Sequence, residues 1–261
     1  MSPEHQCHLL LAPHETLEPR TYARLVAPHL QLTIPDETLR LRYSGGWLLQ
    51  GGDEQQLAIH RSACETLKLG CREVSTEGPP DPPLLLAGSE AFLGKDHLSV
   101  RTHHGESRFP MKEIRAVDLG IVGKLEGALP PQEAEMKRNA EAMLIGLKQS
   151  AQREGLFKCG LKRPNPVLAI VTGEAPEILV IERATRFPDL AAAGGGQTID
   201  NFLEFIDRLV PELDDRAILP GLRRFWSEGL TEGLIRHRHE EHLARQKWLH
   251  HWYASKGPQV G

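Results

Sequence analysis

The chain has 261 residues, of which 40% are hydrophobic and 25% are charged, which is an ordinary composition for a soluble globular protein. A formal net charge of −4 provides no overall attraction to nucleic acid or to anionic lipid. The sequence contains no run of about 18 apolar residues, so a membrane-spanning helix is not expected.

Cysteine usage indicates a reducing compartment. The cysteines Cys7, Cys64, Cys71 and Cys159 are scattered and form no CxxC pair, which argues against a zinc ribbon or a disulfide framework. The N-terminal stretch MSPEHQCHLLLAPHE lacks a positively charged segment followed by a long apolar run, so a secretory signal is not expected. We therefore expect a cytoplasmic protein.

Residues 1–76 are predicted to form a small α/β sandwich. In chain order, the pattern predicts a strand at 7–12, a helix at 19–30, a strand at 38–43, a turn-rich tract at 44–52, a helix at 53–69 and a strand at 71–76. The strand at 38–43 is predicted because Leu39, Leu41 and Tyr43 alternate with polar residues.

The second half of this region carries a signature of a helix, a glycine cap and a strand. Asp53 is the expected N-cap of the helix and Gly70 is its expected C-cap. The stretch at 45–76 resembles the end of the C-terminal domain of the ribosomal stalk protein, and the matching positions are Ala58, Leu67, Gly70 and Val74. No binding residues are carried over from this resemblance.

The segment EGPPDPP at 77–83 is predicted to be a stiff spacer, because its prolines cannot continue a helix or a central strand. The region that follows, 84–216, is rich in strand signals. Leu98, Val100 and Thr102 alternate ahead of an HHGE hairpin turn, and two further strands flank a GEAPE turn. A helical insert is expected at 130–155, and an amphipathic helix is expected from Asp200 onward.

Two motifs of this region resemble the bacterial PH-like domain family. One is an L-x-V strand followed by a glycine turn, and the other is an aromatic-P-x-x-x-I-x-x-V pattern from Phe109 to Val117. The resemblance covers residues 84–213 and implies a β-barrel capped by a C-terminal helix. It also implies scaffolding, since in that family the barrel often serves as a platform for protein docking.

Residues 217–261 are predicted to form a helical tail rich in aromatic and basic side chains. Tryptophan and arginine dominate the energetics of protein interfaces, so we predict that the tail docks onto a protein partner or a second copy of the chain. The predicted contact residues are Trp226, Arg238, Arg245, Trp248, Trp252 and Tyr253. The alternative is that these aromatics pack the helix onto the chain's own domain. Nucleic acid is disfavoured because the chain as a whole is acidic.

The same tail contains the histidine-rich stretch IRHRHEEHLARQKWLHHW. His239 and His242 are three residues apart, so on a helix both imidazoles can reach one metal ion. The order HRHEEH does not match the HExxH signature, and two histidines leave zinc or iron short of ligands. We therefore expect no cofactor, and a zinc- or iron-dependent enzyme or metal sensor is the alternative.

Three weaker patterns do not predict a site. The glycines of AAAGGGQTIDN lack the context of a phosphate-binding loop. In PH domains that bind inositol phosphates this hairpin carries Lys and Arg, whereas here it carries His103, His104 and Arg108 with Glu106 opposing them, so lipid headgroups are not expected. No cysteine or serine lies in a local nucleophile signature. The sequence therefore predicts a non-enzymatic α+β scaffold or adaptor of the bacterial cytosol.

Overall fold

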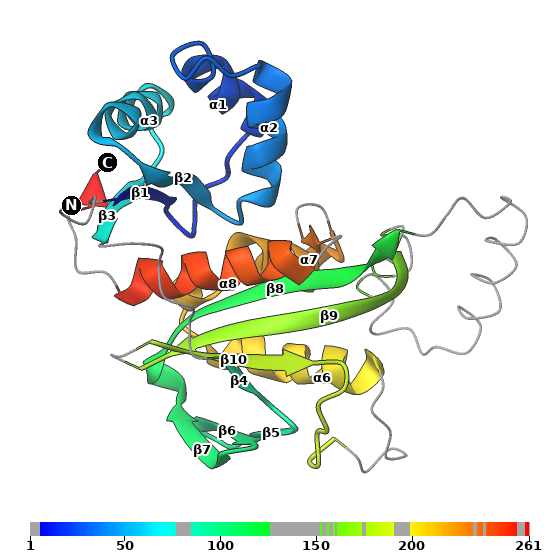
Figure 1. Ribbon diagram of the computed structural model, residues 1–261. Helices are drawn as coiled ribbons and strands as arrows, with labels where there is room; N and C mark the ends of the chain where they lie inside the picture. The colour runs from blue at the N-terminus through cyan, green and yellow to red at the C-terminus, as the bar shows by residue number, and fades with distance from the viewer. Residues whose placement is uncertain are drawn as a thin grey trace, which may run out of the picture. The chain divides into compact units, whose positions relative to one another are not determined.

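The computed structural model of the chain divides into two compact units (Figure 1). Unit 1 comprises Met1–Leu84, Glu174–Pro176 and Glu240–Gly261, and unit 2 comprises Leu85–Gly173 and Glu177–His239. The structure describes residues 6–76, 85–125, 152, 156, 159, 161–173, 176–190, 199–231, 234–236, 239–254 and 259–260. The predicted spacer at 77–83, most of the predicted insert at 130–155 and the glycine loop lie outside the described residues.

Unit 1 is built on an antiparallel sheet whose described strands have the order β12-β3-β1-β2. The strands are β1 (Gln6–Leu11), β2 (Trp47–Gly52), β3 (Cys71–Thr76) and β12 (Gln259–Val260). The helices are α1 (Pro19–Val26), α2 (Ile34–Tyr43), α3 (Glu54–Leu67) and α8 (His239–Ala254). Leu9 and Leu11 of β1 join the core formed with α1, α2 and α3, so these three helices cover one face of the sheet. Figure 1 shows them together on that face.

The predicted strand at 38–43 is wrong, because these residues belong to α2. Thr33 caps the helix, since its side chain accepts a hydrogen bond from the backbone N–H of Asp36, and a proline occupies the first turn. Leu41 is buried whereas Leu39 and Tyr43 are exposed, so the apparent alternation does not correspond to one buried face.

The flanking elements agree with the prediction in part. The tract at 44–52, which the sequence predicts to be turn-rich, contains strand β2. Helix α3 begins at the expected cap, where Asp53 and Gln56 form a reciprocal capping box. Its C-cap is Lys68 in the left-handed conformation (φ 54°) rather than Gly70, because the N–H groups of Lys68 and Leu69 already satisfy the last carbonyls of the helix.

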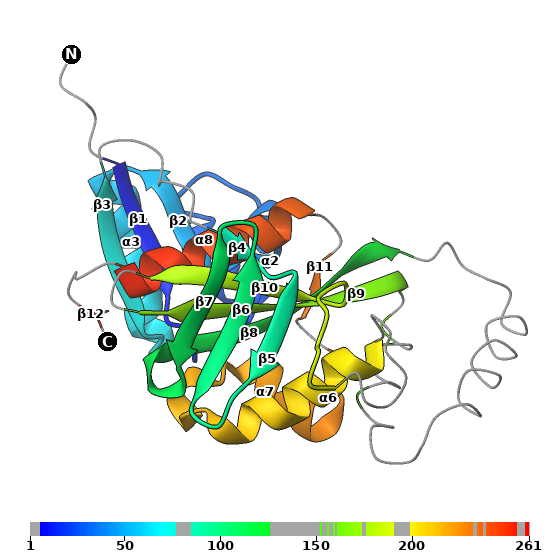
Figure 2. The ribbon, with the colours of Figure 1, turned by 90° about the horizontal axis from the view of Figure 1, so that it is seen from below.

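Unit 2 contains two sheets. The five-stranded sheet has the order β11-β8-β9-β10-β4, with β11 parallel to β8 and β4 parallel to β10, and the three-stranded sheet β5-β6-β7 is an antiparallel meander (Figure 2). The strands are β4 (Leu85–Ala87), β5 (Glu90–Leu93), β6 (His97–Thr102), β7 (Gly105–Pro110), β8 (Ile114–Leu125), β9 (Leu161–Thr172), β10 (Glu177–Glu182) and β11 (Ile235–Arg236). The helices are α6 (Ile199–Leu209) and α7 (Pro220–Glu228), and short 3-10 turns lie at Met111–Glu113, Val210–Glu212 and Asp215–Ala217.

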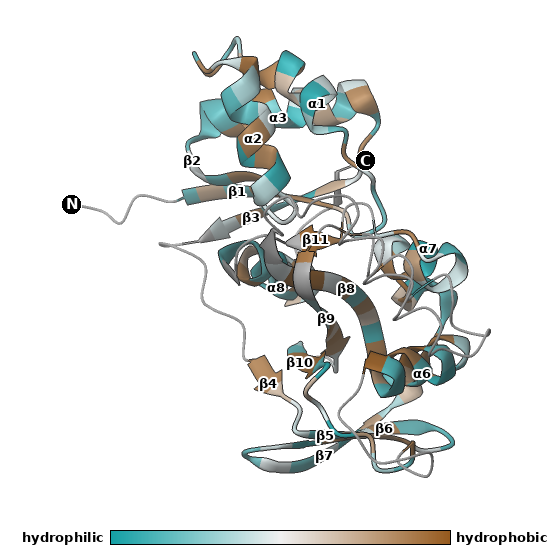
Figure 3. Ribbon diagram, turned by 90° about the vertical axis from the view of Figure 1, so that its right-hand side faces the viewer, coloured by the Kyte–Doolittle hydropathy of each residue, from teal (hydrophilic) through white to brown (hydrophobic). Residues whose placement is uncertain are grey.

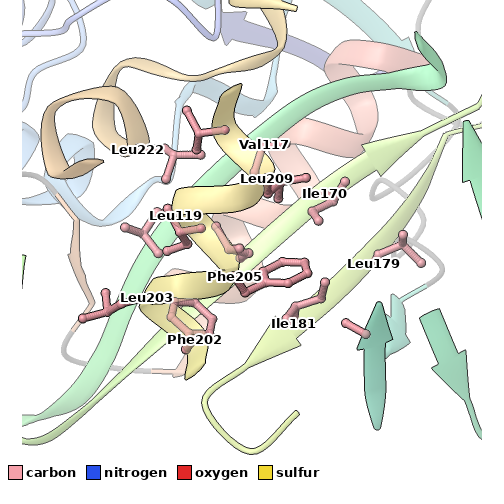
Figure 4. Close-up of a cluster of buried hydrophobic side chains, with 14 of the residues drawn as sticks. Val117, Leu119, Ile170, Leu179, Ile181, Phe202, Leu203, Phe205, Leu209 and Leu222 are labelled. Carbon is pink, nitrogen blue, oxygen red and sulfur yellow. The ribbon is translucent and has the colours of Figure 1, made fainter. Parts of the chain in front are cut away.

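The core of unit 2 lies between α6 and the strands β8, β9 and β10. Phe202 and Phe205 of α6 are fully buried, and Figure 4 shows them facing Leu119 of β8, Ile170 of β9 and Ile181 of β10. The ring of Phe205 lies 4.8 Å from that of Phe187, centroid to centroid. Hydrophobic and hydrophilic residues alternate around α6, as Figure 3 shows, which is the pattern expected for a helix that covers a sheet.

The α+β class is confirmed, because sheets and helices are both present and most strand pairs are antiparallel. The described strands form separate sheets, and they do not close into a barrel. The predicted tail at 217–261 is not a separate part either. Helix α7 belongs to unit 2, whereas α8 from Glu240 onward and β12 belong to unit 1. Among the described helices, none is both long and apolar enough to span a membrane.

Replacing Phe205 by alanine is expected to destabilise unit 2 by roughly 3–5 kcal/mol, because it removes a fully buried ring and leaves a cavity. Urea unfolding monitored by circular dichroism measures the loss. Phe92→Ala is the matched control, since 41% of Phe92 is exposed and its removal should cost far less. Equal losses in the two variants would contradict the assigned core.

Candidate protein-binding surface

Helix α8, which carries most of the predicted contact residues, covers the second face of the unit 1 sheet. The indole Nε1 of Trp248 donates a hydrogen bond of 2.9 Å to the carbonyl of Leu11 in β1. In the opposite direction, the indole Nε1 of Trp47 in β2 donates a bond of 3.2 Å to the carbonyl of Ala244 in α8. Trp248 is fully buried as a result.

Two glycines at the start of β2 allow α8 to approach this closely. Gly45 and Gly46 have φ angles of 67° and 115°, which other residues rarely adopt. A Cβ atom on Gly45 would lie 2.5 Å from the backbone nitrogen of Arg245, and one on Gly46 would lie 2.6 Å from the ring of Trp248. The glycine pair of SGGWLL is therefore a sequence signal for this contact, which the sequence analysis treated only as a turn.

Two arginines extend the same contact through cation–π interactions. The guanidinium of Arg245 lies 4.0 Å from the ring centroid of Trp248, and that of Arg72 lies 4.5 Å from the ring centroid of Trp252. Trp252 is buried and Tyr253 is half-buried. Trp248 and Trp252 are therefore buried within unit 1, which favours the alternative that they pack onto the chain's own domain, whereas Arg245 is half-buried.

Of the remaining predicted contact residues, the structure describes Trp226 but not Arg238. Trp226 of α7 is 36% exposed, and its indole Nε1 donates a 3.1 Å hydrogen bond to Asp207 of α6. Gln152 is buried, and its side-chain amide donates hydrogen bonds to both the Asp207 carboxylate and the Trp226 carbonyl. Arg238 lies outside the described residues. Trp226 thus remains as the one partly exposed tryptophan among the described residues.

The structure describes one of the two candidate metal-binding side chains. His242 is buried, and its Nε2 accepts a 2.8 Å hydrogen bond from the side-chain amide of Gln246. The side chain of His239 lies outside the described part of the chain. Within the described part, no cluster of three or more His, Cys, Asp or Glu side chains is arranged to hold a metal ion. The zinc or iron alternative stays a prediction.

A buried polar cluster lies between α1 and α3 in unit 1. The hydroxyl of Tyr22 lies 3.0 Å from Nδ1 of His60 and 3.8 Å from the sulfur of Cys64. Burial, followed by the charge of Arg40, lowers the pKa of His60 to about 4. The pKa of the Cys64 thiol is raised, first by its hydrogen bond with Cys71 and then by burial, and a raised pKa disfavours the reactive thiolate.

A candidate ligand-binding surface among the described residues is a groove between α1 and α2, which we call the arginine groove. Its cavity of about 530 Å³ is lined by Arg20 and Arg24 of α1 and by Ile34, Pro35, Thr38, Leu39 and Arg42 of α2. The lining combines an apolar floor with three guanidinium groups and contains no carboxylate. Leu39 is 51% exposed, and exposed apolar side chains rimmed by charge are typical of interaction sites.

The three arginines of the groove have charge available for a ligand. Among the described residues none of them forms an ion pair, whereas the neighbouring Arg40 is held by Glu37 at 2.7 Å. Glu18, the N-cap of α1, is an acidic residue close enough to interact with Arg24. Its pKa is lowered mainly by hydrogen bonds from Thr21 and to a smaller extent by the charge of Arg24. The groove is therefore a cationic surface with an apolar floor.

A second hollow, of about 220 Å³, lies on the outer face of the β5-β6-β7 sheet. Its central carboxylate, Glu90, already pairs with Arg101 and Arg186 at 2.5 Å each, and Arg108 donates to the hydroxyl of Ser99. These charges are largely neutralised within the sheet. The hollow is a weaker binding candidate than the arginine groove for this reason.

The groove was not predicted from the sequence. Arg20 and Arg24 are four residues apart, which places them on one side of a helix, and this spacing was the available signal. The residues that α2 contributes to the groove could not be recognised, because residues 38–43 were predicted to form a strand. Comparisons with protein-family models, with curated proteins and with solved structures found no match for this chain.

The packing of α8 predicts that Trp248→Ala lowers the free energy of unfolding of unit 1 by roughly 3–5 kcal/mol, because it removes a fully buried indole and its bond to Leu11. Denaturant unfolding of the full chain gives the value. Trp226→Ala, at a partly exposed tryptophan, is the control and should cost clearly less. A smaller loss for Trp248→Ala than for the control would contradict the assigned packing.

The buried His60 predicts a pH dependence of stability. Its folded pKa of about 4 lies below the unfolded value of about 6.5, so its contribution is fully present above pH 6.5 and is lost as the pH falls toward 4. The loss is roughly 3 kcal/mol. Unfolding curves of the wild type and of His60→Asn between these pH values isolate the contribution as their difference. Parallel pH profiles would show that His60 titrates normally.

Proposed function

We propose that this chain is a non-enzymatic binding protein, and that unit 1 captures an acidic protein segment in the arginine groove. The observation that carries the proposal is the set Arg20, Arg24 and Arg42, which surrounds an apolar floor without a lining carboxylate. The role as a scaffold or adaptor is thus kept from the sequence analysis, and the contact surface moves from the C-terminal helix to α1 and α2.

The chemistry of the groove favours one class of ligand. Leu39, Ile34 and Pro35 offer apolar contact, which a fully hydrophilic acidic chain cannot use. An amphipathic helix can carry apolar residues at a spacing of three and four together with Glu or Asp. Its apolar residues can contact the floor of the groove while its carboxylates pair with the arginines of the rim. Carboxylates also match the planar, forked donors of arginine better than they match lysine. We therefore propose an acidic amphipathic helix as the bound segment.

Unit 2 supports the scaffold role in a second way. Seven strands, β4 to β10, are followed along the chain by α6, and this order supports the PH-like interpretation of residues 84–213. In that family the strand body often serves as a docking platform. The cysteines Cys7, Cys64 and Cys71 form no disulfide, which supports the proposed location in the bacterial cytoplasm, where thiols stay reduced.

A binding assay with a defined probe tests the proposal. The probe is a fluorescein-labelled synthetic helix with Leu at positions i, i+3, i+4 and i+7 and Glu on the opposite side, and fluorescence anisotropy reports its binding to the full chain. We expect saturable binding that weakens about tenfold in Arg24→Glu and in Arg42→Glu, because each change reverses a charge at the rim. Added salt should weaken binding further, since the rim is exposed.

The matched control is Arg183→Glu, which makes the same charge change at an exposed arginine of unit 2. It should bind the probe as the wild type does. A probe with the same composition but scrambled apolar spacing should bind weakly, because it cannot place its leucines on the floor. Equal affinity of the wild type and both groove variants would refute the proposal, as would preferential binding to anionic lipid vesicles over the peptide.

A further inference from the structure

A β-bulge in the unit 1 sheet places a histidine side chain where a backbone partner is missing. Along β1, Cys7 pairs with Gly52 and Leu9 pairs with Leu49, so β2 has one extra residue opposite His8. The backbone N–H of Gly51, within this bulge, donates a 3.1 Å hydrogen bond to Nδ1 of His8. The imidazole thus accepts the hydrogen bond that a backbone carbonyl of β1 would accept in a regular β1–β2 ladder.

The ring of His8 also begins a stack that reaches α8. It meets Trp47 of β2 edge to face, with ring centroids 5.7 Å apart, and Trp47 meets His251 of α8 in the same manner at 5.5 Å. Trp47 is the residue whose indole donates to the carbonyl of Ala244. His8 and helix α8 therefore both contact the buried ring of Trp47, so a shift of His8 can alter how α8 packs on the sheet.

This arrangement requires a neutral imidazole. Because Nδ1 accepts the hydrogen bond from Gly51, the ring proton lies on Nε2 and the lone pair of Nδ1 is the only site that can take up a further proton. A proton there turns the acceptor into a donor, and two N–H groups then face each other. His8 is almost completely buried, so the new charge is also poorly solvated.

Other titratable groups lie on the same side of the sheet, and the charge of one of them, His251, adds to this cost. From β3, the strand that pairs with β1 on its other side, Arg72 lies on the α8 side of the sheet, where its guanidinium covers Trp252. From α8, His250 and His251 are in edge-to-face contact with each other, and Arg245 lies over Trp248. These side chains are basic. Burial first, and then the charge of His251, lower the pKa of His8.

The carboxylates next to β1 and β3 act elsewhere. Glu54 accepts a contact from the thiol of Cys7, and Glu73 pairs with Arg61 of α3. Cys7 joins the core with α1, α2 and α3, so it lies on the side of β1 opposite His8. Both carboxylates are thus engaged on the α1–α3 side of the sheet.

We propose that His8 is an acid-sensitive latch: its protonation at Nδ1 breaks the bond to Gly51, displaces Trp47 and loosens α8 from the unit 1 sheet. The change is reversible and local. Helices α1, α2 and α3 pack on the other face, through a core that does not include His8. The latch adds a regulatory device to the chain and is independent of the arginine groove.

Acrylamide quenching of tryptophan fluorescence tests the latch in the full chain. Trp226→Phe removes the one tryptophan outside the α8 contact, so the signal then reports on Trp47, Trp248 and Trp252. Between about pH 7.5 and about pH 5 we expect the quenching constant to rise about twofold, with a midpoint below the ordinary histidine value. Helical circular dichroism should stay nearly constant, because the rest of unit 1 stays folded.

Two variants in the Trp226→Phe background assign the transition. His8→Asn keeps a side-chain acceptor for Gly51 but cannot titrate, so quenching should stay low across the range. His251→Gln removes the opposing charge and should move the midpoint upward, which keeps the test decisive if His8→Asn does not fold. His29→Asn, at an exposed histidine of the same unit, should behave as its parent.

A pH-independent quenching constant in the parent, an unchanged transition in His8→Asn, or loss of circular dichroism at the same midpoint would each overturn the latch.

Discussion

The contact that the rest of unit 1 depends on is the pair of reciprocal hydrogen bonds between tryptophan indoles and backbone carbonyls, from Trp248 to Leu11 and from Trp47 to Ala244. Successive side chains of a strand point to opposite faces, and every residue from Cys7 to Leu11 is buried. A sheet with two buried faces needs helices on both. Helices α1 to α3 cover one face, and α8, more than 160 residues further along the chain than Leu67 of α3, covers the other.

This architecture assigns the C-terminal aromatic residues a role in the packing of unit 1. A segment rich in tryptophan and arginine is typical of a protein–protein interface. Here these residues form an intramolecular contact, because both sides of the contact belong to unit 1. The surface that we propose for a partner lies on α1 and α2 instead. Binding at the arginine groove can therefore occur without disturbing the core, and the groove and the α8 contact are separable by mutation.

Local signals were readable from the sequence, and contacts across long sequence distances were not. Asp53 was predicted correctly because a cap depends only on its own helix. Helix α2 was missed because Leu39, Leu41 and Tyr43 imitate a strand, while the true signals are the Thr33 cap and a proline in the first turn. In α8 the adjacent Trp248 and Leu249 are both fully buried, so no single apolar stripe revealed which face meets the sheet. The groove exists only once α1 and α2 are paired.

The most direct test of the account is hydrogen exchange of the indole N–H groups of Trp47 and Trp248, followed by NMR in the full chain at neutral pH. If α8 is an integral part of unit 1, both indole protons should exchange as slowly as the backbone amides of Leu10 and Leu11, because all of them open in the same event. Indole protons that exchange rapidly while the β1 amides stay protected would contradict the account, since α8 would then be a loosely attached arm.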